Sequence, residues 1–296
     1  MEKRTLGKTG LQVSRLGAGL AEIGELTDAS TAAEVLNTAL DAGINYLDTA
    51  ACYGDSELWI GRTIAHRRDE YVLGSKAGHV VGEVSGQEWT AETIRESIER
   101  SLVRMRTDCL DLVQLHSCEI EVLERGEAIQ ALQDARQAGK TRYIGYSGNG
   151  KAALWAIDSG LFDTLQTTYN LVDQWARFDV LPRAAAAGMG VIAKRPIANA
   201  AWIARSPYDA TRDYYARQIE GVLETGSLAG APADRIALFL GFALAHETID
   251  TAIVGTGSPA HMRANLAVVE TMLPLQTTLI EELYRRFEQL EGGVQI

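Results

Sequence analysis

The chain has 296 residues, and its composition, 46% hydrophobic and 23% charged, is that of a globular protein that buries a large core. A formal net charge of -11 argues against a basic surface for nucleic acid or anionic lipid, so small-molecule chemistry is the better starting hypothesis. Three cysteines, Cys52, Cys109 and Cys118, are too few and too unevenly spaced for a disulfide framework. No stretch approaches the roughly 18 apolar residues of a membrane span. We therefore expect a cytoplasmic protein with no membrane partner.

Short apolar runs rich in Val, Ile, Leu and Tyr alternate with helical patterns along the chain, as is typical of βα units around a parallel sheet. An N-terminal hairpin is expected first, with strands near residues 4–6 and 12–14. Eight strands follow at residues 15–17, 45–48, 71–75, 112–115, 143–146, 165–168, 190–193 and 252–254. Eight such units at this length predict a (β/α)₈ TIM-type barrel rather than an open doubly wound sheet.

Helical patterns fill the intervals between these strands. They cover residues 31–42, 56–66, 90–105, 126–138, 151–159, 178–187, 232–245 and 259–270. Residues 277–290 are amphipathic and predict an extra C-terminal helix outside the barrel. No linker divides the chain, so residues 1–296 are expected to form a single domain. The longest irregular stretch, residues 196–231, is predicted to be a functional loop.

Polar side chains interrupt the apolar strands at their C-terminal ends, where the reactive groups of barrel enzymes lie. They are Asp48, Lys76, His116, Ser147, Gln166 and Asn170. Any one of them alone is equally well explained as a polar strand end or a helix cap. Because they recur on strand after strand, we expect them to meet at the mouth of the barrel.

Tyr53 follows Asp48 by five positions and adds a candidate general acid to this group. A tyrosine serves as general acid to a carbonyl oxygen if its pKa is lowered from about 10 toward the working pH. Lys76 is placed to be the ammonium that stabilises the phenolate, and Asp48 to keep Lys76 charged and oriented. His116 would donate a hydrogen bond to the substrate oxygen or relay protons to Tyr53. These parts convert a carbonyl and a hydride into an alcohol.

The contexts of this tetrad, NYLDTAACYGDSE, YVLGSKAG and DLVQLHS, resemble those of the aldo-keto reductases, as do GYSGNG and IVGTGSPAHMRANL further on. The resemblance runs from LGKTGLQVSRLG to the last barrel helix. It implies a barrel that binds NADPH without a Rossmann fold and transfers hydride to an aldehyde or ketone. It makes Tyr53 the proton donor, Lys76 and Asp48 the pair that tunes its pKa, and His116 the group that orients the carbonyl.

The same resemblance implies where the cofactor lies. Ser147 and Gln166 match positions that hydrogen-bond the nicotinamide carboxamide, close to Asp48, and Gly19 would allow close approach of the backbone to the cofactor. The adenosine phosphate region is matched by Gly255, Thr256, Gly257, His261 and Asn265. That placement has a physical reason, because backbone N–H groups at a helix N-terminus favour a phosphate.

This chain departs from the family pattern at three places. The segment Ser147-Gly148-Asn149 replaces Ser-Asn, so a second carboxamide contact comes from Asn149 or is absent. Lys194 and Arg195 stand where many members place an aromatic residue over the nicotinamide, and either would cover the ring edge or reach the pyrophosphate. An uncharged Gly257-Ser258 pair replaces the Lys or Arg often found beside the 2′-phosphate, with Arg263 as a candidate substitute. NADPH is the expected cofactor, and NADH stays open.

Other hypotheses remain beside a carbonyl reductase. The enzyme could run in reverse as an alcohol or sugar dehydrogenase. A cofactor-sensing subunit with little turnover would not need Lys76 beside Tyr53, and a phosphosugar barrel would leave Tyr53 unexplained. Cys52, His116 and Cys118 lack the paired spacing of a zinc site, so no metal is expected.

The expected partner is a small carbonyl or alcohol substrate, and nothing in the sequence indicates an oligomeric state. Substrate choice is assigned to the loops at residues 21–29, 79–88, 118–125 and 196–231. Arg195, Arg205 and Arg212 would offer positive charge there to an anionic substrate. Trp89, Trp175 and Trp202 lie in or near loops of the expected active face, where a substrate contact and a packing role are equally open.

Overall fold

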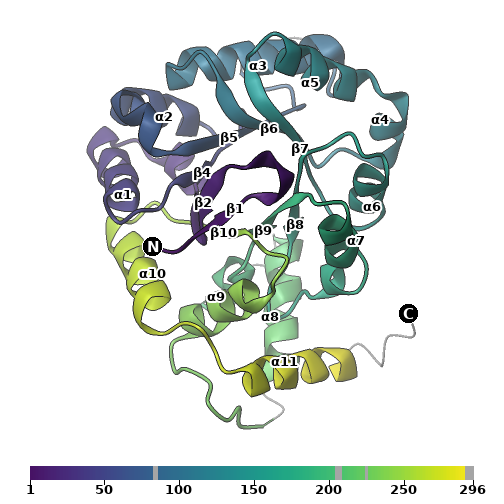
Figure 1. Cartoon of the computed structure of the whole chain (residues 1–296). Helices are drawn as coiled ribbons and strands as arrows, with labels where there is room; N and C mark the ends of the chain where they lie inside the picture. Colours follow the sequence, from purple (N-terminus) through teal and green to yellow (C-terminus); the bar gives the residue numbers. More distant parts are fainter. Residues whose placement is uncertain (83–85, 204–208, 224–225, 291–296) are drawn as a thin grey trace.

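A computed structural model describes residues 1–82, 86–203, 209–223 and 226–290. Eight parallel strands close into a barrel in the order β10-β3-β4-β5-β6-β7-β8-β9. They are β3 (Leu16–Gly19), β4 (Tyr46–Asp48), β5 (Val72–Ala77), β6 (Leu110–His116), β7 (Thr141–Ser147), β8 (Thr164–Thr168), β9 (Gly190–Lys194) and β10 (Thr251–Gly255). Figure 1 looks along the barrel, with the strands at the centre and the helices around them. The predicted (β/α)₈ barrel is confirmed.

Eleven α-helices lie within the described residues. They are α1 (Ala29–Asp41), α2 (Ser56–Thr63), α3 (Ala91–Met105), α4 (Ile120–Arg125), α5 (Glu127–Gln137), α6 (Gly150–Asp158), α7 (Val180–Ala186), α8 (Ala210–Leu223), α9 (Arg235–Ala245), α10 (Pro259–Thr271) and α11 (Thr277–Leu290). Side-chain caps begin several of them: Asp28 accepts from the backbone of α1, and Thr90 from that of α3. Among the helices of the described ranges, none combines the length and apolarity needed to cross a membrane.

Two of these helices were not predicted. α4 replaces most of a loop expected at residues 118–125, and α8 lies inside the stretch 196–231 that was expected to be irregular. α8 buries Tyr215, Ala216, Ile219 and Val222, which share one helical face, and Asp209 accepts a hydrogen bond from its backbone. The prediction of an irregular stretch is therefore wrong for these residues. The apolar pattern of α8 is weak, and the helix is stabilised by packing of its apolar face against other elements.

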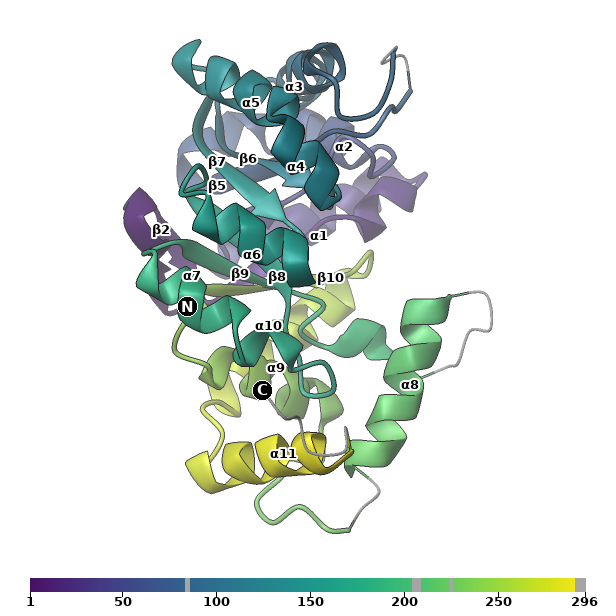
Figure 2. The same cartoon turned by 90° about the vertical axis from the view of Figure 1, so that its right-hand side faces the viewer.

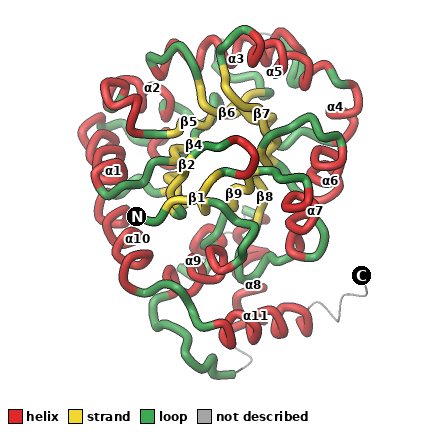
Figure 3. Tube along the Cα trace, viewed as in Figure 1, coloured by secondary structure: helices red, strands yellow, loops and turns green. Residues whose placement is uncertain are grey.

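The C-terminal helix α11 confirms the expected extra helix and lies next to α8 (Figure 3). Its buried stripe includes Leu279, Leu283 and Phe287. Arg286 is also buried, and its guanidinium donates to the backbone carbonyls of Val222, Gly226 and Ser227 at the end of α8. α11 therefore holds the C-terminal end of α8 by hydrogen bonds as well as by packing.

A β-hairpin covers the N-terminal end of the barrel, as predicted. Its strands β1 (Lys3–Thr5) and β2 (Gln12–Ser14) pair antiparallel. Gly7 between them has φ of 46°, and a Cβ there would lie 2.1 Å from the backbone nitrogen of Gly190. Only glycine therefore lets the hairpin approach β9 this closely.

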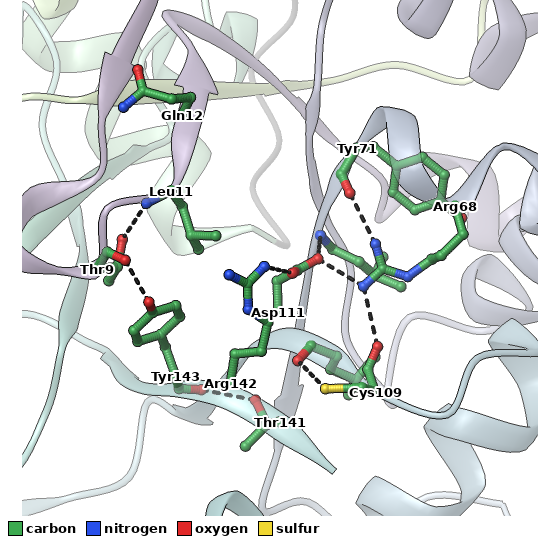
Figure 4. A network of polar contacts seen from close by, with 12 residues as sticks. Thr9, Leu11, Gln12, Arg68, Tyr71, Cys109, Asp111, Thr141, Arg142 and Tyr143 are labelled. Atoms are coloured by element: carbon green, nitrogen blue, oxygen red, sulfur yellow. Dashed lines mark hydrogen bonds and ion pairs between the residues drawn. The ribbon is translucent and has the colours of Figure 1, made fainter. Parts of the chain in front are cut away.

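Polar contacts hold the same end of the barrel together (Figure 4). The carboxylate of Asp111 on β6 accepts from Arg68 at 2.7 Å, from Arg142 at 2.9 Å and from the backbone of Leu73 at 2.9 Å. An apolar cluster fills the inside of the barrel beneath the hairpin, and it includes Leu6 and Leu11 of the hairpin region. The hairpin and this cluster therefore close the inside of the barrel at its N-terminal end.

Candidate functional site

Five of the six predicted strand-end residues meet around one cavity of about 500 Å³ at the C-terminal end of the barrel. The sixth, Asn170, is not among the residues that line it, and its buried side-chain amide donates to the Arg195 carbonyl at 3.0 Å. Asp48, Lys76, His116, Ser147 and Gln166 all line it, each from a different strand between β4 and β8. The strands are parallel and in register, so their C-terminal ends share one rim. Figure 2 shows the hairpin at one end of the barrel and α8 at the other.

A buried ion pair lies at the centre of this cavity. Lys76 Nζ donates to Asp48 Oδ2 at 2.6 Å and to the Thr49 carbonyl at 2.9 Å, and both charged side chains are 2% exposed. Gln166 Nε2 donates to the second oxygen of Asp48 at 3.1 Å. Burial lowers the pKa of Lys76, but Asp48 and Tyr53 raise it by more, so the net direction is upward. Lys76 therefore remains an ammonium.

Tyr53 lies beside this ammonium. Lys76 Nζ is 4.8 Å from the centre of the Tyr53 ring, and the phenol lines the same cavity. Burial raises the pKa of Tyr53 by more than Lys76 lowers it. The predicted net lowering of this pKa is therefore wrong for the cavity as it stands, because the apolar surroundings disfavour the phenolate more than one ammonium favours it. Tyr53 is held protonated at neutral pH.

His116 completes the tetrad as a neutral imidazole. Its ring meets that of Tyr53 edge to face, with centroids 5.6 Å apart and an angle of 80°. Nδ1 lies 3.3 Å from the Sγ of Cys52. Burial, followed by the charge of Lys76, lowers the pKa of His116 to about 2. A neutral ring carries one N–H, so it can donate one hydrogen bond and accept another.

Comparisons with known proteins show to which family the chain belongs. A sequence profile of the aldo/keto reductase family matches residues 15–284. The chain belongs to the aldo/keto reductase family. It is 30% identical to L-galactose dehydrogenase from Arabidopsis thaliana, over 95% of this chain and 93% of that protein. It is 29% identical to D-threo-aldose 1-dehydrogenase from a Pseudomonas species, over 90% of this chain and 92% of that protein.

A solved structure resembles the whole molecule. The holo form of the aldo-keto reductase AKR11C1 from Bacillus halodurans has a TM-score of 0.80 and 26% identity, and the match covers 97% of this chain and 96% of that one. This aldo/keto reductase therefore has sugar-dehydrogenase-like relatives and the barrel of its family.

Seven of the residues predicted to bind the cofactor line the cavity of this aldo/keto reductase. They are Gly19, Asp48, Ser147, Gln166, Lys194, Arg195 and Gly255. The two glycines are close together: a Cβ at Gly19 would lie 3.2 Å from the backbone nitrogen of Gly255. A Cβ at Gly255 would lie 1.9 Å from the carboxylate of Glu22. Both glycines therefore allow close packing within the cavity wall, Gly19 against the backbone of β10 and Gly255 against Glu22.

The other four predicted cofactor residues lie outside this cavity, around the N-terminus of α10. Thr256 Oγ1 accepts from Ser258 N, and Ser258 Oγ accepts from His261 N, so the two hydroxyls shape the turn into the helix. His261 is exposed, Asn265 is buried, and Gly257 lies in the turn. This segment continues directly from Gly255, so an extended ligand leaving the cavity along β10 would reach it.

Four polar residues of the cavity belong neither to the tetrad nor to the predicted cofactor contacts. They are Glu22, Ser117, Asn199 and Arg212. Arg212, expected only as a local charge for an anionic substrate, comes from the first turn of α8, and its Nε is buried without a hydrogen-bond partner among the described residues. A guanidinium nitrogen without such a partner is suited to a phosphate group, and Arg195 lines the same cavity. Glu22 carries no sequence signal that distinguishes it from a surface carboxylate.

The turn after β9 has an unusual backbone. Arg195, Ala198, Asn199 and Ala200 have φ values of 56°, 46°, 52° and 48°, although none is glycine. Left-handed backbone costs of order 1 kcal/mol or more for each such residue and concentrates at functional sites. Arg195, Asn199 and Ala200 line the cavity, so the strained turn lies at the site itself.

Several candidate contacts are engaged elsewhere. Asn149 accepts from Thr167 and from the backbone of Thr168, and Arg263 pairs with Glu34 at 3.1 Å. None of the three loop tryptophans is among the residues that line the cavity: Trp89 packs against His79, Trp175 against Phe287 and Trp202 against Phe239. Arg205 lies outside the described residues. Within the described ranges, no group of three or more His, Cys, Asp or Glu is placed to hold a metal.

Proposed function

We propose that this aldo/keto reductase transfers hydride between NADPH, or NADH, and the carbonyl of an aldehyde, ketone or sugar, with Tyr53 as the general acid. The observation that carries the proposal is the position of Tyr53. Its phenol lies in a 500 Å³ cavity, beside a buried Lys76–Asp48 pair and a neutral His116. A cavity of this size accommodates the reactive end of a cofactor together with a small substrate.

The proton-transfer step follows from these groups. A nicotinamide, when bound, supplies the hydride to the carbonyl carbon. As negative charge develops on the carbonyl oxygen, the Tyr53 hydroxyl donates its proton to that oxygen, and Lys76 stabilises the resulting phenolate. Asp48 keeps Lys76 charged through the 2.6 Å contact. His116, being neutral, donates its one N–H to the carbonyl oxygen and orients it.

The residues present fit the proposed cofactor. Ser147 and Gln166 offer polar atoms on adjacent strands for a carboxamide, and Gly19 and Gly255 contribute backbone to the cavity wall. Arg195 and the unpaired Nε of Arg212 offer positive charge to phosphates. Thr256, Gly257, His261 and Asn265 then border the adenosine end. Arg263, the candidate for the 2′-phosphate, is paired with Glu34 at an exposed position, so NADPH and NADH must be compared directly.

A sugar is the favoured substrate class. Two relatives that align over nearly their whole length are named L-galactose dehydrogenase and D-threo-aldose 1-dehydrogenase. Their names support an aldose, oxidised at a hydroxyl, as the alcohol partner. In that direction Tyr53 first loses its own proton to solvent, and the phenolate, stabilised by Lys76, then accepts the hydroxyl proton while hydride leaves the same carbon for the oxidised nicotinamide. The same four residues serve both directions, so oxidation of a sugar is the second candidate function.

Initial rates followed at 340 nm test the proposal. NADPH and NADH are supplied with a panel of aldehydes and ketones, and NADP⁺ and NAD⁺ with a panel of aldoses. Tyr53→Phe removes the proton donor, so we expect a loss of roughly 10²-fold or more in kcat with little change in cofactor binding. Tyr143→Phe is the matched control, because this hydroxyl donates to Thr9 at the far end of the barrel. Equal turnover by wild type and Tyr53→Phe would refute the mechanism.

A further inference from the structure

Lys194 is the residue of the cavity whose charge the proton-transfer step does not use. It ends β9, is half-buried, and pairs in register with Thr168 of β8. Its Nζ reaches past β8 to Ser147 Oγ on β7, at 3.4 Å. The ammonium therefore crosses the cavity mouth toward the place proposed for the nicotinamide carboxamide.

This ammonium is poorly compensated. Lys76 has a carboxylate 2.6 Å away, whereas no ion pair of Lys194 is found in the part of the chain that the structure describes. The hydroxyl of Ser147 is its side-chain hydrogen-bond partner. Two further cations, Arg195 and Lys76, act on it, and Asp48 offsets them only partly. A positive charge held in this way interacts strongly with any charge placed beside it.

The two oxidation states of a nicotinamide differ in the charge of the ring, and a nearby lysine interacts with that charge. The oxidised ring carries a positive charge, and the reduced ring is neutral. The rest of the cofactor is identical in both states, so its contacts with Arg195, Arg212 and the α10 turn cancel in a comparison of the two. Any difference in affinity must arise at the ring, whose carboxamide the function proposed above assigns to Ser147, the hydrogen-bond partner of Lys194.

We propose that Lys194 makes this site discriminate against the oxidised nicotinamide, so that its protonation state sets the relative affinity for the oxidised and reduced cofactors. The proposal rests on the function proposed above. A charged Lys194 repels the cationic ring and leaves the neutral ring unaffected. A neutral Lys194 removes the repulsion. Lys194 is therefore a specificity-determining residue for the state of the cofactor, distinct from the four groups that move the proton.

The surroundings place this switch near neutral pH. Burial, followed by the charges of Arg195 and Lys76, lowers the pKa of Lys194 to about 7. Two other titratable groups of the cavity lie outside this range: His116 has a pKa of about 2, and the pKa of Tyr53 is raised. Burial raises the pKa of Glu22 above that of an ordinary carboxyl, and His79, paired with Glu88, lies behind His116. Variants at Lys194 separate its contribution from those of Glu22 and His79.

Proton linkage gives the expected sign. The oxidised cofactor favours the neutral lysine, so its binding releases a proton and tightens as pH rises through about 7. Binding of the reduced cofactor through the same range stays nearly constant. The ratio of Kd for NADP⁺ to Kd for NADPH should fall by about tenfold between pH 6 and 8.5, the size expected for two like charges at a partly solvated site.

Equilibrium binding tests the proposal without turnover. Calorimetric titration with NADP⁺ and NADPH at pH 6, 7 and 8.5, in two buffers of different ionisation enthalpy, gives both Kd values and the protons released. We expect Lys194→Met to bind NADP⁺ about tenfold more tightly at pH 6 and to lose the pH dependence of the ratio. Lys194→Arg should keep the discrimination at every pH, because its charge does not titrate. Lys151→Met, which removes an exposed lysine from α6, is the matched control.

The outcomes distinguish this inference from the proposed function. If NADPH binds to wild type and to the variants but the ratio and its pH dependence are the same in wild type and Lys194→Met, the inference is overturned while the proposed function stands. If neither nucleotide binds to wild type, both fail. If Lys194→Met is unfolded, Lys194→Arg alone still decides, because a ratio that follows pH as in wild type would contradict the role of Lys194.

Discussion

At the scale of single residues, the site depends on one buried pair of charges. Lys76 and Asp48 are 2% exposed and lie 2.6 Å apart, so each provides the compensation that the other needs. Burying either charge alone would cost several kcal/mol. The pair also sets the electrostatic surroundings of its neighbours, since Lys76 lowers the pKa of His116 and offsets part of the rise at Tyr53.

Removing one partner of this pair should therefore destabilise the fold as well as the chemistry. We expect Lys76→Met to lower the free energy of unfolding by about 3 kcal/mol or more, because Asp48 is left charged and unpaired. The double variant Asp48→Asn with Lys76→Met should recover a large part of that loss. Urea denaturation of the wild type and of the single and double variants gives the coupling energy. Additive losses would show that the pair is not coupled.

At the scale of elements, the connection between β9 and α9 contributes most to the open side of the cavity. It contains the left-handed turn at Ala198, Asn199 and Ala200, followed by α8, whose first turn carries Arg212 into the cavity. α11 holds the other end of α8 through Arg286. The site therefore depends on a helix that lies outside the barrel and has no place in the eightfold repeat.

In the strained turn, a substitution by glycine should stabilise the fold, whereas glycine usually lowers the free energy of unfolding. Ala200→Gly relieves a φ of 48°, so we expect it to raise the free energy of unfolding by about 1 kcal/mol. Ala267→Gly, at an exposed position within α10, should lower it by about 1 kcal/mol. Thermal unfolding of both variants checks the pair. A loss of stability in Ala200→Gly similar to that in Ala267→Gly would argue against the left-handed turn.

At the scale of the whole molecule, the two ends of the barrel differ in structure: one is packed, and the other contains the candidate site. The hairpin, the apolar cluster beneath it and the Asp111 network fill the N-terminal end. The C-terminal end gathers titratable groups around a cavity instead. His116 is buried at this end as a neutral side chain, and this makes the stability of the fold depend on pH.

His116 fixes the sign of that dependence. Its pKa is lowered to about 2 in the folded chain from about 6.5 in the unfolded chain, so its contribution is present above pH 6.5 and is lost as pH falls. Between pH 7 and 5.5 this one residue should cost about 1.3 kcal/mol of unfolding free energy. Urea denaturation at the two pH values should show a smaller loss in His116→Gln and an unchanged loss in His66→Gln, an exposed control. An equal loss in all three proteins would contradict the buried neutral histidine.

The sequence by itself determined the elements whose signals are local. The eight strands, most of the helices and the C-terminal amphipathic helix follow from apolar periodicity and from capping and turn residues within short windows. The meeting of Asp48, Tyr53, Lys76 and His116 was also predictable, because parallel strands in a barrel bring their C-terminal ends to one rim.

Only the tertiary structure decided the features that depend on burial and on distant partners. α8 was not predicted because its apolar face is weak in the sequence and stabilises a helix only when neighbouring elements cover it. The pKa of Tyr53 was predicted with the wrong sign because the cost of burial, set by the surrounding fold, outweighs the charge of Lys76. The contact of Lys194 with Ser147 joins residues 47 positions apart, and no local pattern reports it. Electrostatic behaviour in this protein is thus a property of the closed barrel, whereas the elements themselves are a property of the chain.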